Sequence, residues 1–394
     1  MVQRGHNFFL IPNPIEKMNT EIKTLEEEIE PKELPLLNNI EDVNFDIIVF
    51  SHLRWGFVYQ RPQHIISRLS DDYNILFVEE PIGRNQDQDF LYELETVSAS
   101  LTVLKPKVNS ISEIPEVLNQ FLKSKQVNIG WFYSAAFSNL ITEYSFNKVV
   151  YDCMDELSLF KFAPPELVEQ EKFLLANADV VFTGGKALYE SKKDLHSNVY
   201  CFPSSVDQQH FEKVFDEIEI PDDIKHITAP IVGYFGVIDE RIDLDLLIHT
   251  ALKLPEVSFV MIGPLAKIED RDLPRAKNIH YLGMKDYAVL PNYLKAFDIA
   301  MMPFALNDAT KHISPTKTLE YMAAKKPIIS TPIKDVVREY GDCIEIVSSS
   351  DEFCISVEKI QKQSNRTITA YDIILENTSW TSTVGKMNDI LNQL

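Results

Sequence analysis

The sequence predicts an α/β protein made of two doubly wound parallel-sheet domains that face each other across a cleft. The chain has 394 residues, a length that suggests two domains. From Phe45 onward, short apolar runs alternate with helical stretches, which is the pattern of βαβ units in a parallel sheet. An acidic, proline-containing stretch at residues 208–229 divides this pattern into two series of similar size. We therefore expect the functional site in the cleft between the two domains.

The same pattern sets the expected segments of the chain. They are an arm or short helix (1–43), a first sheet domain (44–207), a linker (208–229), a second sheet domain (230–375) and a C-terminal helix (376–394). The strand-like runs of the first domain are Phe45–Ser51, Tyr73–Glu79, Leu101–Leu104, Ile129–Tyr133, Lys148–Cys153, Val180–Thr183 and Val199–Phe202. Those of the second domain are Ile231–Phe235, Val257–Ile262, Ile279–Leu282, Ile299–Phe304, Pro327–Ser330 and Ile344–Val347.

Composition and charge narrow the class of protein. Hydrophobic residues make up 45% and charged residues 25% of the chain, which is typical of a soluble globular protein. The formal net charge of −21 argues against a general affinity for nucleic acid or for anionic lipid. The four cysteines lack metal-ligand spacing, and no apolar run reaches the length of a membrane span. We expect a cytoplasmic protein, with a peripheral position at the inner face of the membrane left open.

The stretch around residues 303–331 carries the strongest functional signal. Ser314 and Pro315 follow a buried run and have the residue types of an N-cap and a first helical position. A helix N-terminus suits a phosphate group, and Lys317 in the first turn is better explained if an anion lies in front of it. Glu320 lies three residues on, on the same helix face. The alternative is an ordinary surface ion pair between Lys317 and Glu320.

The run S-P-T-K-x-x-E-Y-M-A-A-x-K-P-I-I-S-T at residues 314–331 resembles the nucleotide-binding motif of retaining glycosyltransferases of the GT-B fold, family 4. The resemblance implies that Glu320 binds the ribose of a sugar nucleotide and that Lys317 meets its diphosphate. It also places Ser314, Pro315 and Thr316 against the donor. Many members carry a second glutamate upstream, where this chain has His312. The first half of that motif is therefore missing, and His312 is placed among the sugar-binding residues.

Two further segments of the second domain fit this resemblance. Gly236 and Arg241 follow the run Ile231–Phe235, where the family has a glycine-rich turn and a basic residue that grips the diphosphate. The alternative for Arg241 is an ion pair with Glu240 or Asp243 at a helix end. Backbone around Gly283 and Met284, at the end of another run, is expected to meet the base.

Asp243-Leu-Asp245 has the letters of a metal-binding D-x-D motif. It lies among apolar residues at an expected helix start, where acidic residues are favoured without any metal. We therefore predict no metal site.

In the first domain, aromatic and basic residues follow the first run. Trp55, Arg61 and His64 are expected to bind sugar, and Gly56 would let backbone approach a phosphate. The pattern W-x(5)-R-P-Q-H is similar to a motif of one bacterial branch of these transferases that acts in surface polysaccharide assembly. The alternative is that Arg61 and His64 cap and pack the helix that follows.

Asp152 and Asp155 close another strand-like run of the first domain. Carboxyl ends of parallel strands border the cleft, so these carboxylates are expected to face donor or acceptor hydroxyls. Solvated acids at a strand end are the alternative.

Taken as a whole, the resemblance implies a hexosyltransferase-type enzyme that needs no metal or other cofactor. The first domain would bind a glycan or lipid-linked acceptor and the second a UDP- or GDP-linked sugar, with the last helix crossing back to the first domain. Transfer would retain the anomeric configuration, with Arg241, Lys317 and Asp152 at the reaction centre. Nucleic acid is not an expected partner, and a peripheral membrane contact is left open. Two alternatives are a sugar-nucleotide epimerase on the same fold and a catalytically inactive nucleotide-binding scaffold.

Overall fold

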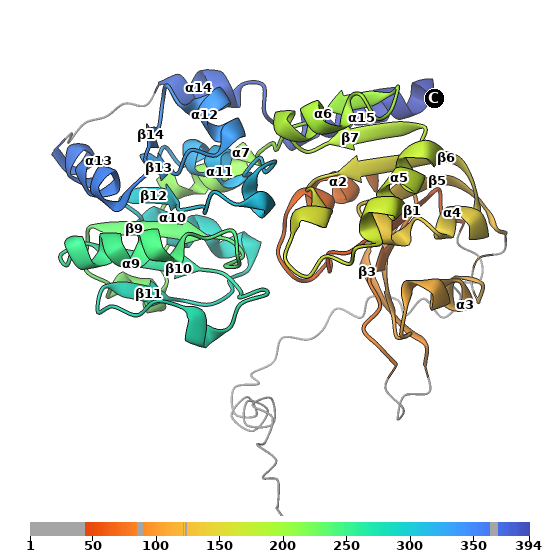
Figure 1. The fold of residues 1–394 in the computed structure, drawn as a ribbon, viewed down its shortest axis with the longest axis horizontal. Coiled ribbons are helices and arrows are strands. Elements are labelled where there is room, and N and C mark those ends of the chain that lie inside the picture. The colour runs from red at the N-terminus through yellow and green to blue at the C-terminus, as the bar shows by residue number, and fades with distance from the viewer. Residues whose placement is uncertain (1–43, 85–89, 121, 123, 363–368) are drawn as a thin grey trace, which may run out of the picture. The chain divides into compact units, whose positions relative to one another are not determined.

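The structure is a computed structural model, and it describes residues 44–84, 90–120, 122, 124–362 and 369–394. These residues form two domains, each built on a twisted sheet with helices on both of its faces (Figure 1). The predicted arm, residues 1–43, lies outside the described residues. The α/β class with two parallel-sheet domains is confirmed.

The first domain contains, within the described residues, an eight-stranded sheet in the order β3-β4-β2-β1-β5-β6-β7-β8. Only the β3–β4 pair is antiparallel among these strands. The edge strand β3 was not expected from the sequence, because most of its side chains are exposed and it lacks an apolar run. The strands are β1 (Ile47–Ser51), β2 (Ile75–Glu79), β3 (Tyr92–Ser98), β4 (Leu101–Pro106), β5 (Gln126–Phe132), β6 (Ser145–Cys153), β7 (Val180–Thr183) and β8 (Val199–Cys201).

The described part of the second domain contains a six-stranded parallel sheet in the order β11-β10-β9-β12-β13-β14. Its first strand in the chain, β9, lies inside the sheet, with β10 on one side and β12 on the other. The strand order therefore reverses next to β9, and ligands of open parallel sheets bind at such a switch point. The strands are β9 (Ile231–Phe235), β10 (Ser258–Ile262), β11 (Ile279–Tyr281), β12 (Ile299–Met302), β13 (Ile328–Ser330) and β14 (Glu345–Ile346).

Helices cover both sheets, and strands such as β1 and β9 are buried along their whole length. This explains why these strands are continuous apolar runs and do not alternate with polar residues. The helices are α2 (Arg61–Leu69), α3 (Ile114–Leu118), α4 (Leu140–Glu143), α5 (Leu167–Asn177), α6 (Lys186–Lys192), α7 (Gln208–Glu212), α8 (Asp222–Lys225), α9 (Leu244–Lys253), α10 (Leu290–Ala296), α11 (Lys317–Ala323), α12 (Lys334–Tyr340), α13 (Ser350–Lys362), α14 (Ala370–Leu375) and α15 (Trp380–Gln393).

Residues 208–229, expected as a linker, contain the short helices α7 and α8. Phe211, Val214 and Ile224 in this stretch are buried in the apolar core of the second domain. The acidic and proline residues that suggested a linker lie between these apolar anchors. The stretch is therefore packed on the second domain and does not run free between the two domains.

The last helix, α15, packs on the first domain although it follows the second domain in the chain (Figure 1). Trp380, Val384, Met387 and Leu391 form its buried face, and all four belong to the first domain's core. Their i, i+4, i+7, i+11 spacing places them on one side of the helix. Burying them holds the end of the chain to the first domain.

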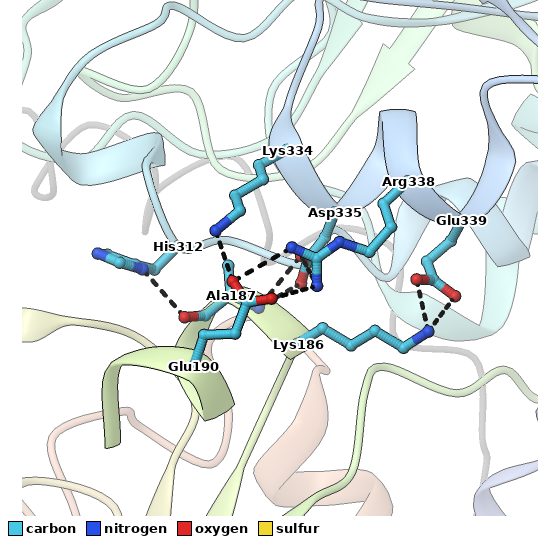
Figure 2. Close-up of polar contacts among 8 residues, drawn as sticks. All are labelled: Lys186, Ala187, Glu190, His312, Lys334, Asp335, Arg338 and Glu339. Carbon is cyan, nitrogen blue, oxygen red and sulfur yellow. Dashed lines mark hydrogen bonds and ion pairs between the residues drawn. The ribbon is translucent and has the colours of Figure 1, made fainter. Parts of the chain in front are cut away.

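Helices α6 of the first domain and α12 of the second meet through a set of ion pairs (Figure 2). Glu190 accepts from Lys334 at 2.6 Å and pairs with Arg338 at 3.1 Å. Lys186 donates to both carboxylate oxygens of Glu339, at 2.6 and 2.7 Å. We call this surface the α6–α12 interface.

At the centre of the α6–α12 interface the backbone at the start of α6 lies close to side chains of the second domain. Helix α6 begins after Gly185, which has no side chain to cap it, and Asp335 of α12 accepts from the Ala187 N–H at 3.1 Å. A Cβ atom at Gly185 would lie 2.7 Å from the Ser314 Cβ and 2.8 Å from an Asp335 carboxylate oxygen. The glycine therefore permits a close approach between the domains, next to the loop that contains Ser314.

Candidate functional site

Two adjoining pockets lie at the carboxyl ends of the strands, beside the switch point at β9. The larger, which we call the cleft pocket, is lined by both domains, among others by Tyr59, Asp155, Arg241, Ser314, Lys317 and Glu320. Its empty space, which includes open solvent, is about 830 Å³. The smaller, the side pocket, shares Tyr59, Lys317 and Glu320 and extends to Gly236, Met284 and Tyr287.

Helix α11 supplies the two charged residues that both pockets share. The helix begins at Lys317, two residues after the expected start, and Thr316 precedes it without a side-chain cap. Ser314 is therefore not the N-cap, and its carbonyl instead accepts from the Ser204 hydroxyl of the first domain at 2.8 Å. Because α11 has only seven residues, anion binding there depends more on the Lys317 side chain than on the helix dipole.

Lys317, which is half-buried, and Glu320, which is buried, have no protein partners in the described chain. The Glu320 side chain is 6% exposed, and burial raises its pKa to about 7, against the attraction of Lys317. Burial lowers the pKa of Lys317, and the charge of Glu320 opposes that. Neither side chain has a hydrogen bond or ion pair within the part of the chain that the structure describes. The alternative of an ordinary surface ion pair is therefore wrong, since two unpaired groups at this depth are costly.

Arg241 lines the cleft pocket and is held by a neighbour that the sequence did not suggest. Its guanidinium makes two parallel bonds to Asp239, Nε to Oδ1 at 3.0 Å and Nη2 to Oδ2 at 2.7 Å. Its face lies over the Phe160 ring of the first domain, 5.4 Å from the centroid. The alternative partners do other things: Asp243 caps α9, and Glu240 accepts from the Lys161 N–H. The fork with Asp239 fixes the guanidinium at the pocket wall.

Asp155 is the carboxylate of the first domain that reaches the cleft pocket. Burial raises its pKa to about 6, although the positive charge of Arg241 favours the ionised form. A carboxylate with this pKa beside a fixed guanidinium accepts hydrogen bonds from ligand hydroxyls at neutral pH.

Asp152, expected at the reaction centre, is fully buried and does not line either pocket. Its carboxylate accepts from Arg61 Nε at 3.0 Å, and Arg61 Nη1 donates to the Phe202 carbonyl at 2.8 Å. Arg61 borders the cleft pocket, but its side chain is only 4% exposed. The expectation of substrate contact is therefore wrong for Asp152, which orients Arg61, and the structural alternative describes Arg61 better.

Trp55, Gly56 and His64 lie outside both pockets. Trp55 packs edge-on against Phe77 at 5.1 Å, and Gly56 is exposed with nothing near its Cα. His64 is buried and stacks on Trp380 of α15 at 4.8 Å, and burial holds its pKa well below the usual range. The expectation of sugar binding is wrong for Trp55 and His64, because their rings pack against Phe77 and Trp380 in the core. Gly56 was expected to approach a phosphate, and it lines neither pocket.

His312 also lies outside the cleft pocket. Its Nδ1 atom is 3.3 Å from the Ala187 carbonyl oxygen, so the ring faces the α6–α12 interface (Figure 2). The expectation that His312 contacts a sugar is therefore wrong. Ser314, Pro315 and Thr316, by contrast, all line the cleft pocket.

The glycine-rich turn after β9 lies against Lys317. Gly236 has φ +144°, and a Cβ there would come within 2.1 Å of the Lys317 Cε. Only glycine lets the lysine lie across this turn. Met284 lines the side pocket and is 41% exposed. Gly283 (φ +68°) does not line it, and its carbonyl accepts from the Gly263 N–H at 2.9 Å.

The sequence did not single out several residues that line the site, Tyr59 and Tyr287 above all. Tyr59 of the first domain stacks on Tyr287 of the second at 4.7 Å, with an interplanar angle of 24°. Tyr59 lies inside the W-x(5)-R-P-Q-H pattern, which gives a weak signal. Tyr287 follows Gly283 by four residues in an irregular segment, and no local pattern marks it.

Parts of this chain are similar in sequence to known proteins. Residues 229–362 match the model of a family described as "Glycosyl transferases group 1". A Bacillus subtilis (strain 168) protein, "Putative teichuronic acid biosynthesis glycosyltransferase TuaH", is 25% identical over 219 residues. That match covers 51% of this chain and 54% of the relative, so the chain spans about half the length of the curated relative that it matches.

Solved structures match over most of the chain. Sucrose-phosphate synthase from Thermosynechococcus elongatus has a TM-score of 0.65 at 12% identity, over 88% of this chain and 98% of its own. Anabaena Alr3699/HepE in complex with UDP and glucose has a TM-score of 0.62 at 13% identity, over 89% and 100%. At such low identity these matches show the fold alone, and the fold is that of GT-B glycosyltransferases.

Within the described residues, no group of three or more histidine, cysteine, aspartate or glutamate residues is placed to hold a metal ion. In the same residues, no helix has the length and apolar character needed to cross a bilayer.

Proposed function

We propose that this protein is a glycosyltransferase that moves a sugar from a UDP- or GDP-linked donor to a glycan or lipid-linked acceptor, with retention of configuration. The family model over residues 229–362 and the teichuronic acid relative support a sugar-nucleotide enzyme of surface polysaccharide biosynthesis. One observation supports the proposal most strongly. The half-buried Lys317 and the buried Glu320 lie in the wall of an interdomain pocket with no protein partner in the described chain.

These two groups and Arg241 complement the parts of a nucleotide sugar. Lys317 and Arg241 carry the positive charge that a diphosphate requires, and Arg241 is already oriented by Asp239. Glu320 accepts hydrogen bonds from two ribose hydroxyls, which replaces the water it loses on burial. The side pocket, with Met284 at its rim, takes the base.

The proposed reaction exchanges one bond for another at the anomeric carbon. The bond between that carbon and the diphosphate oxygen breaks, and a bond to an acceptor hydroxyl oxygen forms on the same face. The hydroxyl proton passes to the departing diphosphate. Negative charge grows on the diphosphate as the bond breaks, and fixed cations stabilise it without a metal. Lys317 and Arg241 supply these cations, and Asp155 is placed to bind hydroxyls of the transferred sugar.

A calorimetric screen of UDP- and GDP-sugars, followed by a transfer assay with the best ligand, tests the proposal. We expect one nucleotide series to bind the wild-type protein and to bind Glu320→Ala more weakly. Sugar release should continue in the presence of EDTA. Absence of binding by every nucleotide sugar would overturn the proposal, and a loss of activity that only Mg²⁺ restores would overturn its metal-independent part.

A nucleotide-binding protein without transfer activity is the second candidate. The observation in its favour is His312, which occupies the place of a motif glutamate and bonds to the Ala187 carbonyl outside the pocket. Under this alternative the nucleotide binds but no sugar is released, with or without acceptor. Single-turnover hydrolysis of the bound nucleotide sugar separates the two candidates.

A further inference from the structure

Tyr287 has a hydroxyl group that the protein leaves without a partner. The residue lies in a 3₁₀ turn, Tyr287–Val289, just before α10. Its hydroxyl oxygen is buried and has no hydrogen-bond partner among the described residues. Buried hydroxyl groups nearly always have a partner, so an orphaned one calls for an explanation.

The tyrosine ring is held on both faces. Tyr59 of the first domain stacks on Tyr287 at 4.7 Å, and His210 of α7 stacks at 4.2 Å with an interplanar angle of 13°. The Tyr287 carbonyl also accepts from His210 Nε2 at 2.9 Å. The ring therefore has little freedom to turn its hydroxyl toward another partner.

The hydroxyl belongs to the wall that contains Glu320. Tyr287 lines the side pocket together with Lys317 and Glu320. Burial and the nearby negative charge of Glu320 both raise the pKa of the Tyr287 hydroxyl, so it remains a proton donor at neutral pH. The pocket thus offers a fixed O–H donor and a carboxylate acceptor, each without a protein partner.

A hydroxyl group of a ligand satisfies both at once. Its O–H donates to the Glu320 carboxylate, and its oxygen accepts from a phenol. We propose that Tyr287 donates a hydrogen bond to the oxygen of a ribose hydroxyl that Glu320 binds, and so sets specificity for the nucleoside. This inference rests on the proposed function, because it requires that Glu320 binds the ribose.

The stack makes this contact depend on both domains. Tyr59 comes from the first domain, whereas Tyr287 and Glu320 come from the second. Tyr59 covers one face of the ring and His210 the other, so one of the two stacking contacts comes from the first domain.

The variant Tyr287→Phe tests the inference, because it removes one oxygen atom and keeps the stacked ring. We expect the affinity for UDP or GDP, whichever binds the wild-type protein, to fall about tenfold in calorimetry, as for one lost hydrogen bond. The ligand-free variant should melt at the wild-type temperature or above it, because an unsatisfied buried hydroxyl is removed. A merely structural tyrosine would not show these two opposite effects.

Tyr281→Phe is the matched control. Its hydroxyl donates to the Pro274 carbonyl at 3.0 Å, in the same domain and outside both pockets. This variant should melt earlier and bind the nucleotide with wild-type affinity. The 2′-deoxy and 3′-deoxy forms of the nucleotide locate the contact, since the effect of Tyr287→Phe should vanish with one of them.

The outcomes separate the inference from the proposed function. If Glu320→Gln weakens binding while Tyr287→Phe does not, the proposed function stands and the inference is overturned. A tenfold loss that persists with both deoxy nucleotides also overturns it. A wild-type protein that binds neither nucleotide overturns the proposed function and the inference together.

Discussion

The α6–α12 interface and the cleft pocket both contain charged residues of the two domains. The charges at the interface are paired within the described part of the protein, whereas Lys317 and Glu320 in the pocket are not. At the interface, Glu190 and Lys186 each have an oppositely charged partner within 2.6 Å (Figure 2). In the pocket, the half-buried Lys317 and the buried Glu320 have no partner within the described residues. Titratable groups left unpaired in this way are common at functional sites.

The two regions should therefore respond differently to mutation. The interface pairs are largely exposed, with the Lys334 side chain 54% accessible, and such pairs add little to stability. The close contact at Gly185 and the buried cap from Asp335 matter more there. We expect the unpaired groups of the pocket to destabilise the ligand-free protein, and we propose that they act in binding or turnover.

The largest expected effect is on turnover by Lys317→Ala. The substitution removes a fixed cation beside the departing diphosphate, and we expect kcat to fall on the order of 10²–10³-fold. Lys186→Ala at the interface is the matched control and should leave kcat within a factor of about two, since an exposed pair contributes at most about 1 kcal/mol. Steady-state kinetics with the best donor measures kcat for both variants. Equal losses of kcat would show that the pocket lysine and the interface lysine contribute equally to turnover.

The second largest expected effect is on the pH dependence of stability, which Glu320→Gln should change. The native pKa of Glu320, about 7, lies above the unfolded value of 4.5, so the native state binds a proton that the unfolded state has lost between these pH values. Wild-type stability should therefore fall as pH rises through this window, by up to about 3 kcal/mol. Glu320→Gln should melt above wild type at pH 8 and close to it at pH 4.5. Denaturant unfolding at both pH values checks the sign, and a variant less stable at pH 8 would contradict the account.

A smaller effect is expected from Gly185→Ala. The added Cβ meets Ser314 and Asp335 at less than 3 Å, so the domains must separate slightly, at a cost of about 1–3 kcal/mol. Because Ser314 lines the cleft pocket, donor affinity should fall as well. Gly56→Ala is the control, since nothing lies within 4 Å of its added Cβ. If Gly185→Ala had wild-type stability, Gly185 would not be in close contact with Ser314 and Asp335.

The smallest effect is expected from Glu190→Gln. This change weakens the pairs with Lys334 and Arg338, which are exposed, and should lower stability only slightly at low ionic strength. The cost should vanish in high salt, because exposed pairs are screened. Unfolding in low and high salt measures this, and a large cost that salt does not change would mean that the pairs are effectively buried.

The sequence predicted the sheets well because their strands are buried on both faces. An apolar run such as Ile231–Phe235 is rarely exposed in a folded chain, so most strands were recognised from their apolar runs alone. Strand β3 was missed because it is an exposed edge strand with few apolar residues. The stretch 208–229 was taken for a linker because single anchors such as Phe211 do not form a pattern.

The site was predictable only where residue type and local motif agree. Arg241, Lys317 and Glu320 line the cleft pocket, and their proposed roles stay predictions. Asp152 and His64 were placed wrongly because a polar residue after a strand either faces the cleft or turns inward to a distant partner. Which of these happens depends on residues such as Arg61 and Trp380, which are far away in the chain. Tyr287 was missed for the same reason, since its neighbours Tyr59 and His210 come from other elements.

The most direct test of the account is the pH dependence of nucleotide-sugar binding. If ionised Glu320 binds the ribose, affinity should follow ionisation with a pKa of about 7 and fall about tenfold between pH 8 and pH 6. Calorimetric titration of the best UDP- or GDP-sugar at both pH values measures this in the wild-type protein and in Glu320→Gln. Glu320→Gln should bind the nucleotide sugar more weakly than wild type, and its affinity should depend little on pH. Binding that is equally tight in both proteins and at both pH values would contradict the account.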